Sequence, residues 1–316
     1  VTVSMLTLPK HLPVLAISPS IDSSRGELRD KLQALLEADG ILVSRAGIFE
    51  PSTCGQDLVS LLTHADLVLT DSPVIKNLPQ LMFNAPTPGG RGERENAFHC
   101  QSSTDLYHCA ERIKLWLEHC RSSTPLAGAV LIGGRSSRMG CPKHLIQHEN
   151  GETWLERSLA TLSPFVDDLV ISGGGELPTA LQTTERVDDL PGVQGPLAGI
   201  RALLNHYPFC SWVILACDMP NLDPRSIAWL LSQRKGRQRA VIPRNPHTGR
   251  SEPLLAWYDY RCAPLIDNMI ASGKRKISEL CNFELTAQPL IPEVLVVSWR
   301  NVNYPEELNS RGSSGP

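Results

Sequence analysis

The sequence predicts an α/β protein with a doubly wound, mostly parallel sheet and a smaller α/β domain at the N-terminal end. Three observations lead to this prediction. Short apolar runs alternate with helical segments through most of the 316 residues, as in successive β-α-β units. Polar residues follow several of these runs directly, at the strand ends where open sheets bind ligands. The length suits two domains of ordinary size.

The N-terminal part carries the first of these units. Leu12–Ser18 is predicted as a strand, and the segment from Glu27 as a helix whose leucines share one face and which Gly40 ends. We expect this α/β domain to span residues 1–122. Its other predicted elements are strands at Ile41–Ser44 and Ala65–Asp71, a loop from about Asn84, and a helix at Thr104–Cys120.

A second series of units follows the short linker RSSTP. We expect it to form the larger domain, residues 123–309, and the tail 310–316 to be disordered. The predicted strands are Ala127–Gly134, Asp168–Ser172, Arg186–Asp188, Trp212–Cys217 and Ala240–Pro243, and the predicted helices are Thr153–Leu162, Pro196–His206 and Pro224–Arg234.

Composition excludes several classes of protein. A net charge of −3 gives no basic field for nucleic acid, and no apolar run approaches the roughly 18 residues of a membrane span. The first residues lack the charged region of a signal peptide. The nine cysteines form no C-x-x-C pair, which argues against zinc or a disulfide framework. We therefore expect reduced thiols, a cytoplasmic location, and no nucleic-acid or membrane partner.

Residues 131–145, LIGGRSSRMGCPKHL, form the first candidate site. Gly133 and Gly134 would let main-chain amides approach an anion, and Arg138 and Lys143 can neutralise phosphate charge. A Gly-Gly pair alone is a weak signal, and the segment matches neither the P-loop nor the G-x-G-x-x-G pattern. A basic surface loop is the alternative.

The whole string L-x-G-G-x-S-x-R-M-G-x-x-K resembles the signature loop of the MobA-like nucleotidyltransferases. The double glycine resembles the guanylyltransferases that act on the molybdenum cofactor, whereas their cytidylyltransferase relatives more often carry Ala-Gly. Pro142 departs from the pattern, because an Asp often precedes the Lys, and it is expected to alter how the loop turns. The matching residues are Leu131, Gly133, Gly134, Ser136, Arg138, Met139, Gly140 and Lys143.

The resemblance assigns roles within this loop. It implies that Leu131, Gly133, Gly134 and Lys143 bind the nucleotide, and that Arg138 and Lys143 act in catalysis by stabilising phosphate charge.

The segment RVDDLPGVQGPLAGI (186–200) resembles the family's D…GPLAG segment. Asp188 takes the acidic position that contacts the nucleotide, with Asp189 as the second choice. Gly195 precedes a helix whose N-terminal amides suit an anion or the base. A simple turn with proline at the first helical position is the alternative.

The segment WVILACDMPNL (212–222) places Asp218 at the end of an apolar strand. The family resemblance of C-D-M-P implies that Asp218 is catalytic, binds the nucleotide and holds Mg²⁺, a hard cation that prefers oxygen ligands. The alternative is an aspartate that caps a helix.

Three C-terminal segments extend the resemblance over residues 126–309. SEPLLAWY (251–258) has Glu252 where Gln or His is common. RNVNYPEEL (300–308) carries Asn301 and Asn303, which the resemblance places near the pterin substrate or the metal, although Tyr304 replaces the usual Thr. Asn301 is as well explained by an Asx turn. Lys274 and Arg275 lie in a segment that in the family helps to bind the pterin phosphate.

The reaction implied by the resemblance joins GMP from GTP to molybdenum-molybdopterin, giving molybdopterin guanine dinucleotide and diphosphate. Mg²⁺ is the expected cofactor, and molybdopterin-handling proteins and acceptor molybdoenzymes are the expected partners. The alternatives are a cytidylyltransferase, a sugar-phosphate nucleotidyltransferase, and a non-catalytic nucleotide-binding protein of the same pathway.

The first domain weakly resembles MobB, a GTP-binding family, with a degenerate P-loop. The two glycine positions of that loop fall on Pro19 and Ser24, Arg25 replaces the lysine, and Gly26 replaces the Ser or Thr that binds magnesium. Proline has no N–H for a phosphate, so we expect no GTP hydrolysis by this domain. An unrelated α/β domain is the alternative.

Overall fold

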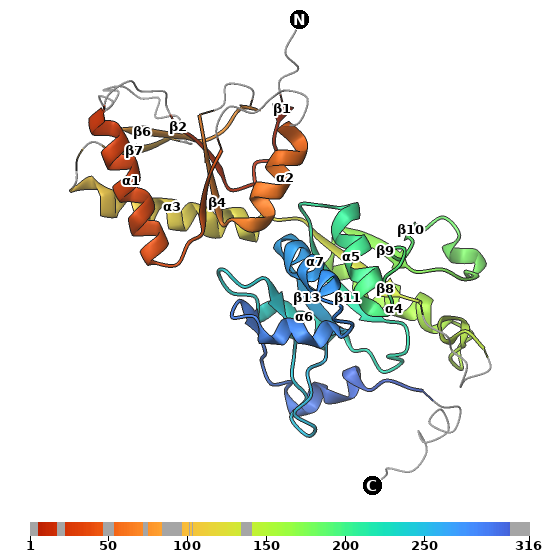
Figure 1. Cartoon of the computed structure of the whole chain (residues 1–316). Helices are drawn as coiled ribbons and strands as arrows, with labels where there is room; N and C mark the ends of the chain where they lie inside the picture. Colours follow the sequence, from red (N-terminus) through yellow and green to blue (C-terminus); the bar gives the residue numbers. More distant parts are fainter. Residues whose placement is uncertain are drawn as a thin grey trace, which may run out of the picture. The chain divides into compact units, whose positions relative to one another are not determined.

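The computed structural model describes residues 6–17, 23–46, 54–71, 75–83, 97–100, 102, 104–133 and 141–303. The chain divides into two compact units, Val1–Thr124 and Pro125–Pro316 (Figure 1). Each unit has a sheet of mainly parallel strands with helices packed on it, so the predicted fold class is confirmed. Within these ranges, no helix is long and apolar enough to cross a membrane.

The N-terminal unit is built on a five-stranded sheet with the order β3-β4-β2-β6-β7, in which every neighbouring pair is parallel. The short strands β1 (Leu6–Thr7) and β5 (Ile75–Lys76) form a separate parallel pair. The five strands are β2 (Val14–Ile17), β3 (Val43–Ala46), β4 (Leu67–Thr70), β6 (Gln80–Phe83) and β7 (Ala97–Cys100), and the helices are α1 (Ser23–Ala38), α2 (Cys54–His64) and α3 (Asp105–Ser122).

Helical spacing explains how α1 packs in this unit. Leu28, Leu32 and Leu36 recur every four residues and are buried, so one stripe of the helix faces the sheet. The helices α1 and α3 pack against each other and share one apolar core with the strands. The helices α1 and α3 were predicted from the sequence, whereas α2, β6 and β7 were not.

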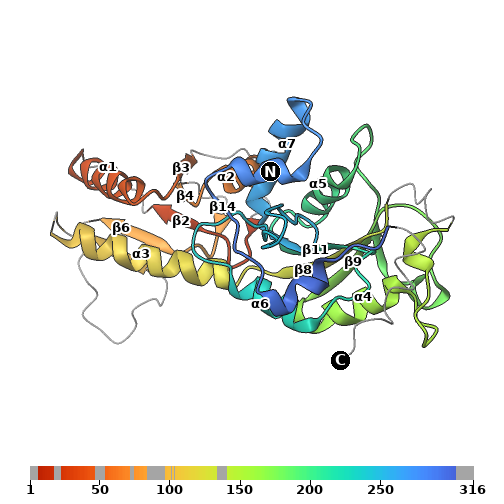
Figure 2. The ribbon, with the colours of Figure 1, turned by 90° about the horizontal axis from the view of Figure 1, so that it is seen from below.

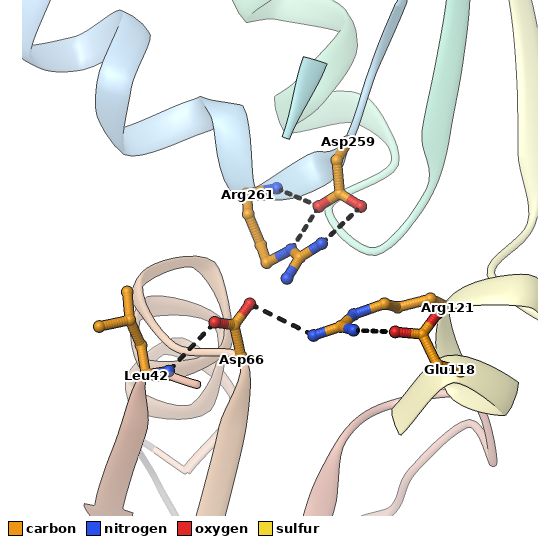
Figure 3. A network of polar contacts seen from close by, with 6 residues as sticks. All are labelled: Leu42, Asp66, Glu118, Arg121, Asp259 and Arg261. Carbon is orange, nitrogen blue, oxygen red and sulfur yellow. Dashed lines mark hydrogen bonds and ion pairs between the residues drawn. The ribbon is translucent and has the colours of Figure 1, made fainter. Parts of the chain in front are cut away.

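Buried charges tie the start of β4 to α3. Asp66 is 1% exposed, and its Oδ2 accepts the N–H of Leu42 at 3.1 Å. Its Oδ1 lies 3.7 Å from Arg121, which also binds Glu118 at 2.7 Å (Figure 3). Because a buried carboxylate needs partners, these contacts join the starts of β3 and β4 to the end of α3.

The C-terminal unit has a seven-stranded sheet with the order β10-β9-β8-β11-β13-β12-β14. Only β13 runs antiparallel to its neighbours. The strands are β8 (Leu126–Leu131), β9 (Asp168–Ser172), β10 (Glu185–Val187), β11 (Ser211–Ala216), β12 (Ala240–Val241), β13 (Ala256–Tyr258) and β14 (Thr286–Ala287). The helices are α4 (Trp154–Leu162), α5 (Pro196–His206), α6 (Pro224–Ser232) and α7 (Ala263–Ala271), with 3-10 turns η1 (Lys143–Leu145), η2 (Ser163–Phe165), η3 (Thr179–Leu181), η4 (Tyr260–Cys262), η5 (Ile277–Asn282) and η6 (Glu293–Trp299).

Helices cover both faces of this sheet. Figure 2 shows α5 and α7 on one side of β8, β9 and β11, and α4 and α6 on the other. Every residue of β8 and β11 is buried, which is why both strands read as continuous apolar runs. In η4, Asp259 accepts the N–H of Arg261 at 3.0 Å and its Nε at 2.7 Å, so this buried pair closes the turn before α7 (Figure 3).

The order of the strands creates a crevice beside β8. The chain leaves β8 toward β9 and β10 on one side, then returns through α5 to β11 on the other side. The carboxyl ends of β8 and β11 therefore border the point where the strand order reverses. Open α/β sheets bind their ligands at this position.

Candidate functional site

A cavity of about 330 Å³ lies at the carboxyl ends of β8 and β11. Its wall is built by the ends of these two strands, the start of α5 and the turn that carries Lys143. Such a volume is at the lower end of the range for small-molecule sites. The lining residues are Leu131, Ile132, Gly133, Lys143, Asp189, Gly195, Pro196, Gly199, Ala216, Cys217, Asp218 and Leu254.

Three predicted residues from distant segments meet beside this cavity, and two of them, Lys143 and Asp218, line it. The Nζ of Lys143 donates to Oδ2 of Asp218 at 2.9 Å and to Oδ1 of Asn303 at 2.7 Å. The side chains of Lys143 and Asp218 are each 15% exposed, so water screens their attraction only in part. The arrangement holds a cation at the strand ends, where an anionic ligand would enter.

Pro142 fits the turn that delivers Lys143. Its φ of −60° is the value that the proline ring prefers, and its carbonyl accepts the N–H of Leu145 at 3.0 Å to close η1. The proline thus stands at an extended position directly before a 3-10 turn, and Lys143 still reaches Asp218.

One carboxylate oxygen of Asp218 is oriented by a protein group, and the other is not. Oδ2 is bound to Lys143, whereas buried Oδ1 has no hydrogen-bond partner among the described residues. The main-chain carbonyl of Asp218 accepts the N–H of Val302 at 3.0 Å, which fixes the backbone there. The side chain bonds a lysine rather than a helix amide, so the geometry is not that of a helix cap.

Mg²⁺ fits this donor set. The described part of the chain holds no group of three or more His, Cys, Asp or Glu side chains that could cage a metal. Mg²⁺ does not need such a cage, because it commonly takes one or two carboxylates together with substrate phosphates and water. The unsatisfied oxygen of Asp218 offers one such ligand.

The second acidic residue of the cavity lining is Asp189, and Asp188 is not among the lining residues. The preference for Asp188 in the sequence analysis therefore shifts to its neighbour. Burial, and then the charge of Asp188, raise the pKa of Asp189 above its usual value.

Two glycines of the GPLAG segment shape the same wall. Gly195 caps α5 with φ 75° and ψ −165°, a conformation that only glycine adopts readily. A Cβ on Gly199 would lie 3.1 Å from Oδ1 of Asp189 and 2.8 Å from Oγ of Ser172. The missing side chain of Gly199 thus leaves room for the Asp189 carboxylate.

Other predicted residues lie away from the cavity or outside the described residues. Asn301 is exposed and does not line the described cavity, and neither do Lys274, Arg275 and Glu252. Lys274 instead pairs with Glu279 at 3.4 Å. Burial raises the pKa of Glu252. Gly134, Ser136, Arg138, Met139, Gly140 and Tyr304 lie outside the described residues.

Two further residues of the site, Cys217 and Leu254, were not predicted from the sequence. Both line the cavity, and each stands beside a recognised motif: Cys217 precedes Asp218, and Leu254 belongs to SEPLLAWY. Burial is the main cause that raises the pKa of Cys217 to about 12. The thiol therefore stays protonated, and Cys217 forms part of the cavity wall. Adjacency to the motifs was the available signal.

Together, the doubly wound sheet and the Lys143–Asp218 pair at its switch point define a nucleotide-binding α/β domain. Residues 128–288 match the family model described as "MobA-like NTP transferase domain". The match covers half of the chain, and the chain belongs to this family. The predicted resemblance to the MobA-like nucleotidyltransferases is therefore confirmed for the C-terminal unit.

Two proteins with sequences similar to this chain carry the same name. A protein of Pelotomaculum thermopropionicum named "Probable molybdenum cofactor guanylyltransferase" is 31% identical over 188 residues, covering 57% of this chain and 89% of its own length. A Geobacillus protein with the same name is 31% identical over 193 residues, covering 58% of this chain and 96% of its own.

Among solved structures, molybdopterin-guanine dinucleotide biosynthesis protein A of Archaeoglobus fulgidus is 30% identical to this chain. The match covers 58% of this chain and 95% of that protein, with a TM-score of 0.48.

Proposed function

We propose that this chain transfers GMP from GTP to molybdenum-molybdopterin, forming molybdopterin guanine dinucleotide and diphosphate. Membership of the MobA-like family and 31% identity to two named guanylyltransferases support the proposal. The observation that carries it is the hydrogen bonding of Lys143 to both Asp218 and Asn303 beside a cavity that Lys143 and Asp218 line. These residues belong to three of the segments that resemble the MobA-like nucleotidyltransferases.

In the proposed reaction, a terminal phosphate oxygen of the pterin attacks the α-phosphorus of GTP. A bond forms between that oxygen and phosphorus, the bond to the bridging oxygen of the β-phosphate breaks, and diphosphate leaves. This displacement needs positioning and charge neutralisation more than a protein nucleophile. Lys143 would stabilise the charge that develops on the phosphates, and Gly133 would offer its amide to them.

Asp189 would contact the nucleotide from the part of the wall near Gly133 and Gly199. Asp218 would hold Mg²⁺ through its unsatisfied Oδ1, and the bound cation would screen the charge of the α-phosphate and of the leaving diphosphate. Lys143 keeps Oδ2 of the same carboxylate in place, so the two charges on this wall fix each other's position. Arg138 and Gly134 would also contact the nucleotide phosphates. The pterin would be contacted by Asn301, Lys274 and Arg275.

A nucleotide comparison tests the proposal. The purified chain is incubated with Mg²⁺, molybdenum-molybdopterin and either GTP or CTP, and the dinucleotide product and diphosphate are measured. We expect product with GTP and a strong preference over CTP. A preference for CTP would make the chain a cytidylyltransferase. Nucleotide binding without any product would make it an accessory protein of the pathway.

We also propose that the N-terminal unit is a degenerate MobB-like domain that docks a partner or substrate without hydrolysing GTP. The carboxyl ends of β2 and β4 are neighbours, and their connections leave in opposite directions, toward β3 and toward β6. This is a switch point suited to a ligand. The loop that follows β2 carries Pro19 and lies outside the described residues.

The absence of GTP hydrolysis can be measured in the full chain. Without a pterin acceptor, we expect no release of inorganic phosphate from GTP above the buffer rate. Steady phosphate release that persists in Asp218→Ala would assign hydrolysis to the N-terminal unit and contradict the proposal.

A further inference from the structure

A loop of three glycines, Gly173–Gly175, follows β9 and borders the nucleotide site without lining it; we call it the triglycine loop. Gly173 is buried and has φ 108°, and Gly175 has φ 133°. Residues with side chains rarely adopt either conformation. The loop therefore depends on glycine at these two positions.

Gly173 lies in close contact with Gly133, whose main-chain amide is proposed to bind phosphate. A Cβ at Gly173 would lie 2.9 Å from the amide nitrogen of Gly133 and 3.2 Å from its Cα. Main chain, rather than a flexible side chain, occupies this space, so neither partner can yield without moving the loop. The missing side chain at Gly173 therefore sets where the Gly133 amide stands.

Two side chains hold the carbonyl groups of the triglycine loop and of Glu176, the residue that follows it. The Nε of Arg186 donates to the carbonyl of Gly173 at 2.8 Å, and its Nη1 donates to that of Gly175 at 2.9 Å. His144 is 4% exposed, and its Nε2 donates to the carbonyl of Glu176 at 2.8 Å. The hydrogen bond requires a proton on this nitrogen, because a carbonyl oxygen can only accept.

His144 also connects this loop to the catalytic turn. It is the second residue of η1, directly after Lys143, so its anchor at Glu176 holds the turn that aims the Lys143 ammonium. The triglycine loop therefore touches both arms of the site, Gly133 on one side and the Lys143 turn on the other.

We propose that Gly173, Arg186 and His144 form a brace that positions the Gly133 amide and the Lys143 turn for the nucleotide phosphates. These are positioning residues, since none of them lines the described cavity. The inference rests on the proposed function, because it assigns the brace to nucleotide binding at the same site.

Two adjacent glycines give a matched test. Gly173→Ala forces a Cβ against Gly133, whereas a Cβ on exposed Gly174 would meet nothing closer than a 3.6 Å contact with Arg186. GTP affinity is measured by calorimetry on the full chain. We expect Gly173→Ala to weaken binding by at least about tenfold and Gly174→Ala to bind like the wild type. Equal affinities for the two variants would overturn the proposal.

A second pair of variants keeps the test open if Gly173→Ala does not fold. His144→Ala removes the anchor without adding atoms, and we expect the rate of product formation at saturating GTP to fall by at least about tenfold. His144→Gln restores a side-chain N–H donor and should recover most of that loss. A merely structural histidine would instead give equal rates for both variants and a matching loss of thermal stability, which would contradict the brace.

Amide hydrogen exchange separates failure of the brace from failure of the proposed function. If the wild type binds no GTP, the proposed function is wrong. Even then, exchange across residues 126–133 should be faster in Gly173→Ala than in Gly174→Ala. Equal exchange in the two variants would reject the brace by itself.

Discussion

The Nζ of Lys143 lies 2.9 Å from Oδ2 of Asp218, although the two residues are 75 positions apart in the sequence. Each side chain is only 15% exposed, so removal of either charge leaves the other poorly solvated. Oδ1 of Asp218 has no hydrogen-bond partner among the described residues. The pair therefore orients one oxygen and leaves the second oxygen for a cation.

Asp218→Asn should separate the catalytic use of this carboxylate from its structural use. The amide keeps the shape but loses the charge for Mg²⁺, so we expect product formation to fall by about 100-fold or more. The change in the free energy of unfolding should stay within about 2 kcal/mol, because Lys143 keeps its bond to Asn303. Steady-state assays and urea denaturation measure the two effects.

The control for this variant is Asp267→Asn. Asp267 also pairs with a cation, Arg201, at 2.8 Å, but between α5 and α7 and outside the cavity lining. We expect its activity to match the wild type. Equal activity losses for both aspartate variants would point to a general effect of charge rather than to the site.

Gly199→Ala should weaken nucleotide binding even though it replaces a helical glycine. Such a change normally stabilises a helix by about 0.5–1 kcal/mol. Here the new Cβ would lie 2.8 Å from Oγ of Ser172 and 3.1 Å from Oδ1 of Asp189, so Asp189 must move. We expect GTP affinity to drop by about tenfold and no gain in stability.

A glycine with open surroundings provides the comparison for Gly199. Gly26 lies in α1, and a Cβ there would meet nothing within 4 Å. Gly26→Ala serves as the stability control and should raise the unfolding free energy by about 0.5–1 kcal/mol. If Gly199→Ala gave the same stabilisation and normal affinity, the close packing around Asp189 would not matter for the site.

Asp189→Asn should weaken GTP binding and raise the stability of the fold, and the gain in stability should depend on pH. The pKa of Asp189 in the unfolded chain is near 3.8, and burial raises it in the folded protein. The folded state therefore binds the proton more tightly, and the cost of the charge is fully present above the raised pKa and vanishes below 3.8. At pH 7 we expect the variant to be more stable by at most about 0.5 kcal/mol, because solvent screens this carboxylate.

Unfolding curves of both proteins across pH 3 to 8 check this sign. The stability difference should shrink as pH falls toward 4, and at pH 7 the GTP affinity of the variant should be lower than that of the wild type. A difference that grew on acidification would mean that the folded protein stabilises the charged form of Asp189, which would contradict burial as the cause of the shift.

The sequence predicted some elements of the C-terminal unit to the residue, because local pattern determines them. The bounds of β9 and α5 agree with the prediction, and both elements combine a clear apolar pattern with a clear start or stop. The helices α2 and α7 and the strands β6 and β7 were missed. These strands have only four residues each, too few for periodicity to separate them from loops.

Contacts at the site were harder to predict than its members. Motif spacing identified Lys143, Asp218 and Asn303, but their meeting point depends on strand order, which pairs β8 directly with β11. The choice between Asp188 and Asp189 depends on which of the two side chains lines the cavity, and both follow the end of β10, where strand alternation gives no guide. The approach of Gly173 to Gly133 joins two loops and has no local signature at all.

The strained backbone of Leu255 gives a last prediction about the wall of the cavity. Leu255 has φ 65° and is fully buried, its N–H donates to Ile214 at 2.8 Å, and its carbonyl accepts Nε1 of Trp299 at 3.1 Å. This conformation costs about 1–3 kcal/mol. The two hydrogen bonds hold it, and so fix the neighbouring Leu254 in the cavity wall.

Trp299→Phe keeps the buried ring but removes the N–H that Leu255 accepts. A buried carbonyl that loses its donor costs about 1–3 kcal/mol, so we expect destabilisation of that size. Leu255→Gly relieves the strain but forfeits a buried leucine, worth about 2–5 kcal/mol, so the loss should prevail. The double variant should be destabilised by less than the sum of the two single losses, because the Trp299 contact serves to hold the strained leucine. Strict additivity in urea denaturation would show that the two residues act independently.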